Sequence, residues 1–326
     1  MKRFLNIFLC FILIFNVCII TSFAEDKSST TGSDTATVKE TETALLNYLN
    51  SKEEKIQIGT PEYTEYLVEL LMFENDESLK ALPQYENIKI YASEYLTQID
   101  NPNATVSKDG RMQLNKAEEA KTIADIKEEA KAETMEAMAE TSVELPSAEA
   151  SATSGYSDSK AVAYAKKWAT SQNPLYKNHY DVDCTNFVSQ CVKAGGKSMK
   201  KPSTIPTGIN ETTKYWYSVR YDDCRTNNII YRWKESTSFI RVTDFFTYWK
   251  NKGISTAYYS TKQAAQNGAV IGDVVQLKNG DGRWFHSIII TGGSKGNRTF
   301  CAHSDSYKDK PVSKISGAVS YRSLKF

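Results

Sequence analysis

The sequence is poor in the residues that metal sites and charged partners usually require. It holds 3 histidines in 326 residues, no Cys-x-x-Cys pair and no His-Glu-x-x-His motif, so a zinc site has no support. The formal net charge is +1, which indicates neither a nucleic-acid-binding protein nor a strongly acidic one. No internal repeat is visible. We therefore expect no metal ion and no nucleic-acid partner.

What the chain does contain is typical of a globular protein of about two domains. Hydrophobic residues make up 40% and charged residues 24% of the sequence. Most of the 19 tyrosines and 5 tryptophans lie after residue 155. The main folded unit is therefore expected in the second half of the chain.

Residues 1–24 have the pattern of a secretory signal peptide. Lys2 and Arg3 precede an apolar stretch over residues 4–20, and small residues follow it at 22–24. The apolar stretch is short for a membrane span. We expect removal of this segment, a secreted or cell-wall-associated protein, and no stable membrane anchor.

Four cysteines remain after that removal. Cys184 and Cys191 are seven positions apart on one expected helix, about 10 Å by helical rise, which exceeds the reach of a disulfide. If a bridge forms, Cys224 with Cys301 or with Cys191 is the better candidate.

Residues 25–141 are expected to form a mainly helical N-terminal region, followed by a linker over residues 142–156. Pro61 is expected at the first position of one helix. Residues 88–99 fit a strand or a helix, and residues 116–140 predict an exposed or weakly packed helix. An inhibitory pro-region, a targeting unit and a spacer all remain possible roles for the region.

Residues 157–326 show helices first and strands last, which is the order of an α+β domain. Ser157 or Asp158 is expected to cap the first helix, and Thr243 or Asp244 opens a later one. Strands are expected at residues 215–221, 229–233, 269–277, 283–291 and 298–303.

A short helix from Asp183 to Gly196 carries the strongest chemical signal. Asp183 is a good N-cap, Gly195 or Gly196 suits the C-terminus, and apolar residues recur on one face between them. Cys184 would then lie where free backbone N–H groups and the helix dipole favour a thiolate. The thiolate is the nucleophilic form of cysteine.

Two blocks give this part of the chain a family resemblance. The first runs from Ala161 through Trp168 and Asn173-Pro174 to the sequence Asp183-Cys184-Thr185-Asn186-Phe187-Val188-Ser189-Gln190-Cys191 and Ala194-Gly195-Gly196. The second is Gly272-Asp273-Val274-Val275 followed by Phe285-His286-Ser287-Ile288-Ile289-Ile290-Thr291-Gly292. Over residues 155–326 the chain resembles the putative amidase domain of bacterial surface proteins, which is similar to the papain-like NlpC/P60 and CHAP peptidoglycan hydrolases.

The resemblance implies a papain-like α+β fold and a cysteine amidase or peptidase that needs no cofactor. Cys184 would be the nucleophile and His286 the general base and acid. His303 would orient His286, with Asp305 as the other candidate. The implied substrate is a peptidoglycan or peptide amide bond, and we expect a monomer. A wall-binding or adhesion module without turnover is the alternative.

Three other features of the sequence bear on the same site. Tyr176 or Tyr180 is a possible second oxyanion donor beside the Cys184 backbone N–H. His179 is interpreted as a solvated loop residue. The G-x-S-x-G pattern at residues 292–296 is followed by an expected strand, so it does not form a nucleophile elbow, which requires a helix after the turn.

Overall fold

The computed structural model describes residues 33–52, 55–99, 105–106, 111–142, 155–179, 183–223, 230–303 and 306–326. The expected signal peptide, and Tyr180, Cys224 and Asp305, lie outside the described residues. Residues 31–326 form one compact unit. Within the described residues, no helix is both long and apolar enough to cross a membrane.

The N-terminal region is mainly helical, as the sequence predicts. Residue 61 is the first of its helix and Thr60 caps it by accepting a hydrogen bond from the backbone N–H of Tyr63. The ambiguous segment near residue 90 is a helix. The elements are α1 (Val38–Ser51), α2 (Pro61–Phe73), α3 (Glu77–Lys80), α4 (Tyr85–Ile99), β1 (Thr105–Val106), β2 (Met112–Gln113), α5 (Lys116–Ala120) and α6 (Ile123–Ser142).

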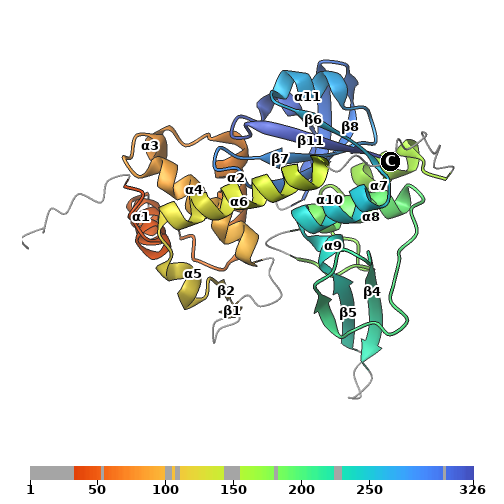
Figure 1. The fold of residues 1–326 in the computed structure, drawn as a ribbon, viewed down its shortest axis with the longest axis horizontal. Helices are drawn as coiled ribbons and strands as arrows, with labels where there is room; N and C mark the ends of the chain where they lie inside the picture. The colour runs from red at the N-terminus through yellow and green to blue at the C-terminus, as the bar shows by residue number, and fades with distance from the viewer. Residues whose placement is uncertain are drawn as a thin grey trace, which may run out of the picture. The chain divides into compact units, whose positions relative to one another are not determined.

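The C-terminal part has the expected order of helices and then strands, so the α+β class is confirmed (Figure 1). Its elements are α7 (Asp158–Trp168), α8 (Cys184–Ala194), β3 (Gly208–Asn210), β4 (Ser218–Asp223), β5 (Ile230–Ser236), α9 (Thr237–Ile240), α10 (Val242–Asn251), β6 (Ser255–Tyr259), α11 (Lys262–Gly268), β7 (Val274–Lys278), β8 (Trp284–Ser294), β9 (Asn297–Ala302), β10 (Tyr307–Pro311), the 3-10 helix η1 (Val312–Lys314) and β11 (Ser320–Lys325).

The main sheet has six antiparallel strands in the order β10-β9-β8-β7-β11-β6. The sequence predicts β7, β8 and β9, which form its middle, but not β6, β10 and β11. A second sheet joins β3, β5 and β4. It is a small sheet next to α9 (Figure 1).

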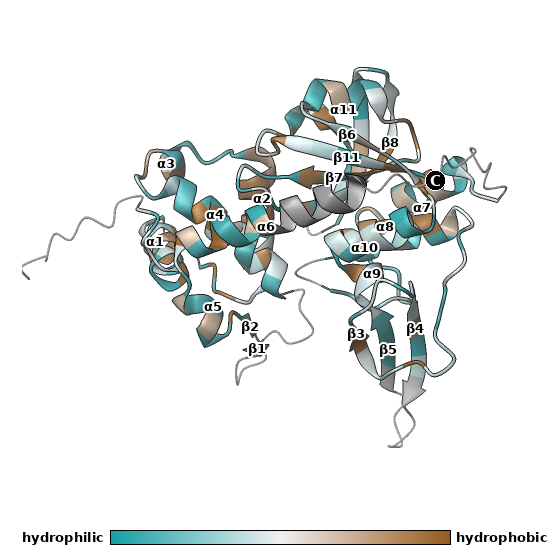
Figure 2. Ribbon diagram, viewed as in Figure 1, coloured by the Kyte–Doolittle hydropathy of each residue, from teal (hydrophilic) through white to brown (hydrophobic). Residues whose placement is uncertain are grey.

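Each face of the main sheet packs against different helices. Successive strand residues point to opposite faces, and β8 shows this clearly. Ile289 packs with residues of α7, α8 and α10, whereas Ile288 and Ile290 pack with the N-terminal helices. Figure 2 shows apolar stretches along α4 and β7, where helices and sheet meet. The sheet is therefore covered on both faces.

The N-terminal helices are tied to the sheet by polar contacts as well. The backbone N–H groups of Ser316 and Gly317 donate to the Met72 carbonyl at 2.8 and 3.1 Å. Arg283 forms a buried ion pair with Glu94 of α4 at 2.9 Å. The first turns of α6 are also buried, at Ile123, Ile126 and Ala130, so this helix is better packed than its composition suggests.

Candidate functional site

Cys184 is the first residue of α8, as the sequence predicts, and its side chain is buried with 4% of its surface exposed. The helix forms here because Phe187, Val188 and Cys191 give it one apolar face, and all three are fully buried. It ends where the N–H of Lys197 donates to the Val192 carbonyl at 3.3 Å.

The end of α8 requires glycine. Gly196 has a φ of 117°, a conformation that side-chain-bearing residues rarely adopt. Its N–H donates to the Lys193 carbonyl at 3.0 Å. Gly195 is thus the C-cap of α8, and Gly196 after it is the residue with a positive φ.

Asp183 precedes the helix but does not cap it through its side chain. Its backbone is helical rather than extended, and its carboxylate makes no cap hydrogen bond. The carboxylate instead accepts from His303 Nδ1 at 2.6 Å and from Asn186 Nδ2 at 2.7 Å. The expected capping role was wrong because two side chains compete successfully for the carboxylate.

His303 is held at the start of α8 from both ring nitrogens. Nδ1 contacts Asp183, and Nε2 lies 2.7 Å from the Trp168 carbonyl oxygen. The ring also stacks on Phe187, with centroids 4.0 Å apart. Both partners are acceptors, so the imidazolium form satisfies both contacts.

The charge on Asp183 is stabilised by that arrangement. Burial alone would raise the pKa of the Asp183 carboxyl, but the hydrogen bond and charge of His303 outweigh it and lower the pKa. The carboxylate beside Cys184 therefore persists as half of an ion pair, and its negative charge opposes a thiolate less than a lone carboxylate would.

The structure does not bring His286 to Cys184. In the regular part of β8, Ser287 contacts Thr185 of α8 at 3.1 Å, so its neighbour His286 points to the opposite face. There it is fully buried, and neither ring nitrogen has a hydrogen-bond partner among the described residues. Burial lowers the pKa of His286 to about 3.

The expected contact between the two imidazoles is absent for the same reason. Both ring nitrogens of His303 face Asp183 and Trp168, and those of His286 are unpartnered within the described part of the chain. His303 therefore does not select the tautomer of His286 in this structure.

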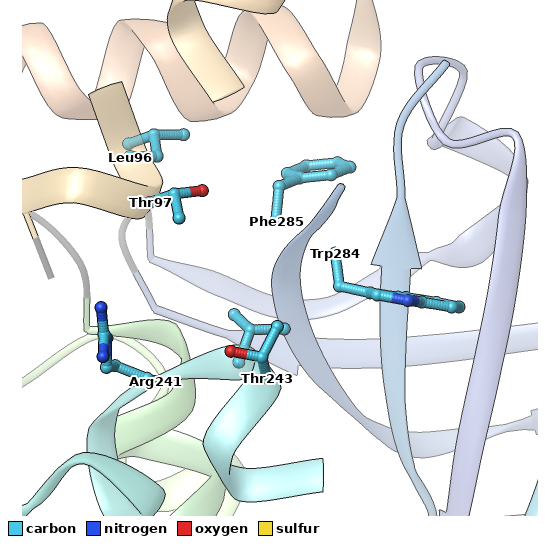
Figure 3. Close-up of a pocket in the computed structure, with 7 residues that line it drawn as sticks. Leu96, Thr97, Arg241, Thr243, Trp284 and Phe285 are labelled. Atoms are coloured by element: carbon cyan, nitrogen blue, oxygen red, sulfur yellow. The ribbon is translucent and has the colours of Figure 1, made fainter. Parts of the chain in front are cut away.

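A bulge in β8 determines which way His286 points. Lys278 pairs with Trp284, but Leu277 pairs with His286, so Phe285 is an extra residue. Phe285 belongs to the core under the N-terminal helices. In Figure 3 it lies beside Leu96 and Thr97, whereas Trp284 extends away from them. Bulges are common where a strand re-aims a side chain next to a functional site.

A small hollow adjoins the bulge. It has a volume of about 40 Å³, enough for a water molecule or two but not for a substrate. Its lining comes from α4, the start of α10 and the start of β8: Leu96, Thr97, Arg241, Val242, Thr243, Trp284 and Phe285 (Figure 3).

His179 is not a solvated loop residue, and that interpretation was wrong. Its side chain is 8% exposed, and Nε2 lies 2.8 Å from Glu235 Oε2. Burial by itself would lower the pKa of His179, but the charge and hydrogen bond of Glu235 outweigh it and raise the pKa. No local pattern indicates that Glu235, 56 residues later, is the partner of His179.

The two histidine–carboxylate pairs lie next to each other. The His179 backbone N–H donates to Asp183 Oδ1 at 3.3 Å, so the two pairs are adjacent. Asn186 Nδ2 also donates to the Lys177 carbonyl at 3.0 Å. Tyr176 stacks on Phe239, with ring centroids 6.0 Å apart.

The largest of the hollows described lies on the small sheet, next to this loop. It measures about 410 Å³, within the range of small-molecule and peptide sites. Its lining combines cations, aromatic rings and small residues: Lys177, Thr207, Gly208, Tyr221, Arg232 and Trp233.

The remaining thiols and motifs make no competing site. Cys184, Cys191 and Cys301 are free thiols, and burial raises the pKa of Cys191 well above its usual value. No group of side chains among the described residues is arranged to hold a metal ion. Residues 292–296 join β8 to β9, so the rejection of a nucleophile elbow is confirmed.

Comparisons with known proteins give one family and two similar proteins. A family model described as "Putative amidase domain" matches residues 155–323. Two uncharacterized proteins of Bacillus subtilis (strain 168) are similar: YhbB is 31% identical over 138 residues, and YjcM is 50% identical over 46 residues. These matches span 42% and 14% of this chain, and 37% and 11% of the relatives. No solved structure gives a significant match.

Proposed function

Because the chain belongs to the family described as "Putative amidase domain", we propose that it is an exported cysteine hydrolase acting on amide bonds of cell-wall peptidoglycan. The family supports hydrolysis of an amide. The cysteine mechanism, the papain-like character of the fold, the wall substrate and the export are our proposal.

The observation that carries the proposal is the position of Cys184. Its sulfur opens a helix, where backbone N–H groups and the helix dipole favour negative charge. The Thr185 hydroxyl lies 3.7 Å from the sulfur. The adjacent carboxylate of Asp183 is hydrogen-bonded by His303 at 2.6 Å. This is the setting of a nucleophilic thiolate.

The proposed reaction has two steps. The Cys184 sulfur attacks the amide carbonyl carbon, the C–N bond breaks, and a histidine gives a proton to the leaving amine. Water then attacks the thioester and gives a proton back to the histidine. The carboxylic acid leaves, and the thiolate is restored without a metal or an organic cofactor.

We assign the proton transfer to His286, as the family resemblance implies, and this requires a rearrangement of the start of β8. Movement of the bulge by one residue would turn His286 toward α8, because a one-residue slip exchanges the faces of a strand. Two unpartnered ring nitrogens in a buried site cost about 1–3 kcal/mol each. That cost favours an arrangement in which the imidazole finds a partner.

His303 receives a different role from the one that the resemblance implies. It holds Asp183, and through Asp183 the start of α8. We propose that it is a positioning residue for Cys184. His303→Gln should then lower kcat while His286→Gln abolishes turnover, since glutamine can still donate to Asp183.

The hollow on the small sheet suits an acidic peptide. Lys177 and Arg232 offer positive charge, and Trp233 and Tyr221 offer flat apolar surfaces. Peptide stems of the bacterial wall carry carboxylates next to amide bonds, which makes them a fitting substrate class.

Incubation of the purified protein with peptidoglycan, followed by measurement of newly released amines, tests the function. Cys184→Ala should abolish release. Cys191→Ala is the matched control, because Cys191 lies on the same helix but is fully buried with a raised pKa. Full activity of Cys184→Ala would refute the cysteine mechanism.

The separation of Cys184 from His286 favours a second candidate, a wall-binding module without turnover. Such a module would bind peptidoglycan in a sedimentation assay as tightly in Cys184→Ala as in the wild type, and neither protein would release amines.

A further inference from the structure

A chain of buried hydrogen bonds runs from the Cys184 sulfur across the sheet to Arg322. Arg322 Nε donates to Gln276 Oε1 at 2.7 Å, and Gln276 Nε2 donates to Ser287 Oγ at 3.2 Å. Ser287 Oγ lies 3.1 Å from Thr185 Oγ1, which lies 3.7 Å from Cys184 Sγ. All five side chains are at most 4% exposed.

The direction of these hydrogen bonds follows from the donors available. Arginine can only donate, which fixes the oxygen of the Gln276 amide toward Arg322. The amide nitrogen therefore faces Ser287, and its other hydrogen goes to the Val242 carbonyl at 2.8 Å. The Gln276 amide therefore accepts from Arg322 through its oxygen and donates to Ser287 and to Val242 through its nitrogen.

The hydroxyl groups continue the same direction. Ser287 accepts from Gln276, so its own hydrogen is available for Thr185. Either atom can donate in the contacts of Thr185 with Ser287 and with Cys184, and the order that continues this direction has Thr185 accepting from Ser287 and donating to the sulfur. In that order, each link donates toward Cys184, and hydrogen bonds aligned in one direction strengthen one another.

The cation at the far end has no carboxylate partner among the described residues. Arg322 is 2% exposed, and its Nη2 atom makes no hydrogen bond in this part of the chain. Its guanidinium lies between the rings of Phe246 and Trp284, 3.6 and 4.1 Å from their centroids. A buried cation without a carboxylate is costly, so its presence calls for an explanation.

Other charged groups lie around the start of α8. Asp183 contacts His303, Glu235 contacts His179, and the charge of Lys177 acts on the second pair. Burial lowers the pKa of Arg322 to about 9, so the guanidinium is still protonated at neutral pH. Arg322 therefore places a buried positive charge at the far end of the hydrogen-bond chain.

We propose that Arg322, Gln276, Ser287 and Thr185 form a proton-donor chain that stabilises the thiolate of Cys184. These four are positioning residues, since none of them contacts the reacting carbonyl in the proposed mechanism. The inference rests on the proposed role of Cys184 as nucleophile. It adds a source of thiolate stability that lies outside the helix dipole and the histidines.

The pH dependence of Cys184 alkylation tests this chain directly. The full chain is treated with iodoacetamide over a range of pH, and mass spectrometry follows labelling of the Cys184 peptide. We expect Ser287→Ala to raise the midpoint by about 0.5–1 pH unit, the loss of one hydrogen bond. Thr185→Val, which removes the last donor, should do the same.

Ser189→Ala is the matched control. Ser189 is a buried serine of α8 whose hydroxyl donates to the Phe239 carbonyl and accepts from Trp216, outside the chain. Its midpoint should equal that of the wild type. A change in access to the sulfur would scale the labelling rate at every pH without moving the midpoint.

Equal midpoints for Ser287→Ala, Thr185→Val and Ser189→Ala would overturn the proposal. So would a wild-type midpoint at or above about 8.5, the value of an ordinary thiol. The readout needs no substrate, so it also separates the two hypotheses. If the variants raise the alkylation midpoint but the wild type releases no amine, the donor chain is supported and the enzyme hypothesis is refuted.

Discussion

Replacement of His286 by leucine should make the protein more stable in acid. Leucine keeps an apolar side chain in the core and removes a buried imidazole with two unpartnered nitrogens. It also removes a group that the unfolded chain protonates more readily than the folded one. The pKa of His286 falls from 6.5 to about 3 on folding because of burial.

The sign and size of the effect follow from that difference. Between pH 6.5 and pH 3 the unfolded chain binds a proton at His286 that the folded chain does not, so the free energy of unfolding falls as pH falls. At 1.36 kcal/mol per pH unit, the full loss comes to about 5 kcal/mol. A loss of that size is a large fraction of the 5–15 kcal/mol typical of a domain.

Urea unfolding at pH 7 and at pH 4.5 measures the effect. The wild type should lose about 2–3 kcal/mol more than His286→Leu between these two values. Ile288→Val, on the same strand and face, should lower stability equally at both. Identical losses in the wild type and in His286→Leu would show that the imidazole is not held neutral in the core.

Three further outcomes follow from the packing. Glu94→Gln should lower the free energy of unfolding by about 1–3 kcal/mol, measured by urea unfolding, because it removes the nearer of two carboxylates from the buried Arg283 guanidinium and leaves Glu129 at 3.6 Å. Residues 153–326 alone should bind a hydrophobic dye and lack a cooperative thermal transition, since the sheet face under the N-terminal helices becomes exposed. Above pH 3.8, the ordinary pKa of an aspartate, the lowered pKa of Asp183 stabilises the folded protein. This contribution is lost as the pH falls through the lowered pKa. The difference in the free energy of unfolding between Asp183→Asn and the wild type should therefore narrow below about pH 4.

Local signals predicted the elements around the site well. Pro61 and Thr60 fixed the start of α2, and the apolar face at Phe187 and Cys191 fixed α8. Such signals lie within a few residues of each other, so a pattern reveals them. Cys184 at the head of α8 belongs to this class.

The details that decide the chemistry depend on partners far away in the sequence. The side of the sheet toward which His286 points depends on the extra residue Phe285 in the bulge. The alternation of apolar and polar residues in the sequence does not reveal this bulge. The carboxylate of Asp183 turns to His303, which is 120 positions later. Neither contact has a local signal, so the sequence does not reveal that the Asp183 side chain turns away from the cap or that His286 faces away from α8.

The other three strands of the main sheet were missed for a related reason. β6, β10 and β11 are short and carry many polar residues, such as Arg322 and Ser323 of β11. Arg322 is buried only because it lies between two aromatic rings that other elements supply. Alternation of apolar and polar residues does not reveal a strand of this kind.

The place of β11 between β6 and β7 has a consequence for the newly made chain. These six residues, Ser320–Lys325, are near the end of the sequence, yet they join β6 to the rest of the sheet. The Ser316 hydroxyl just before them donates to the Phe73 carbonyl, 243 positions away. Contacts this distant slow folding. Until β11 has been synthesised, β6 cannot join the rest of the sheet, so we expect a chain that stops before Ser320 to be an easy target for proteases.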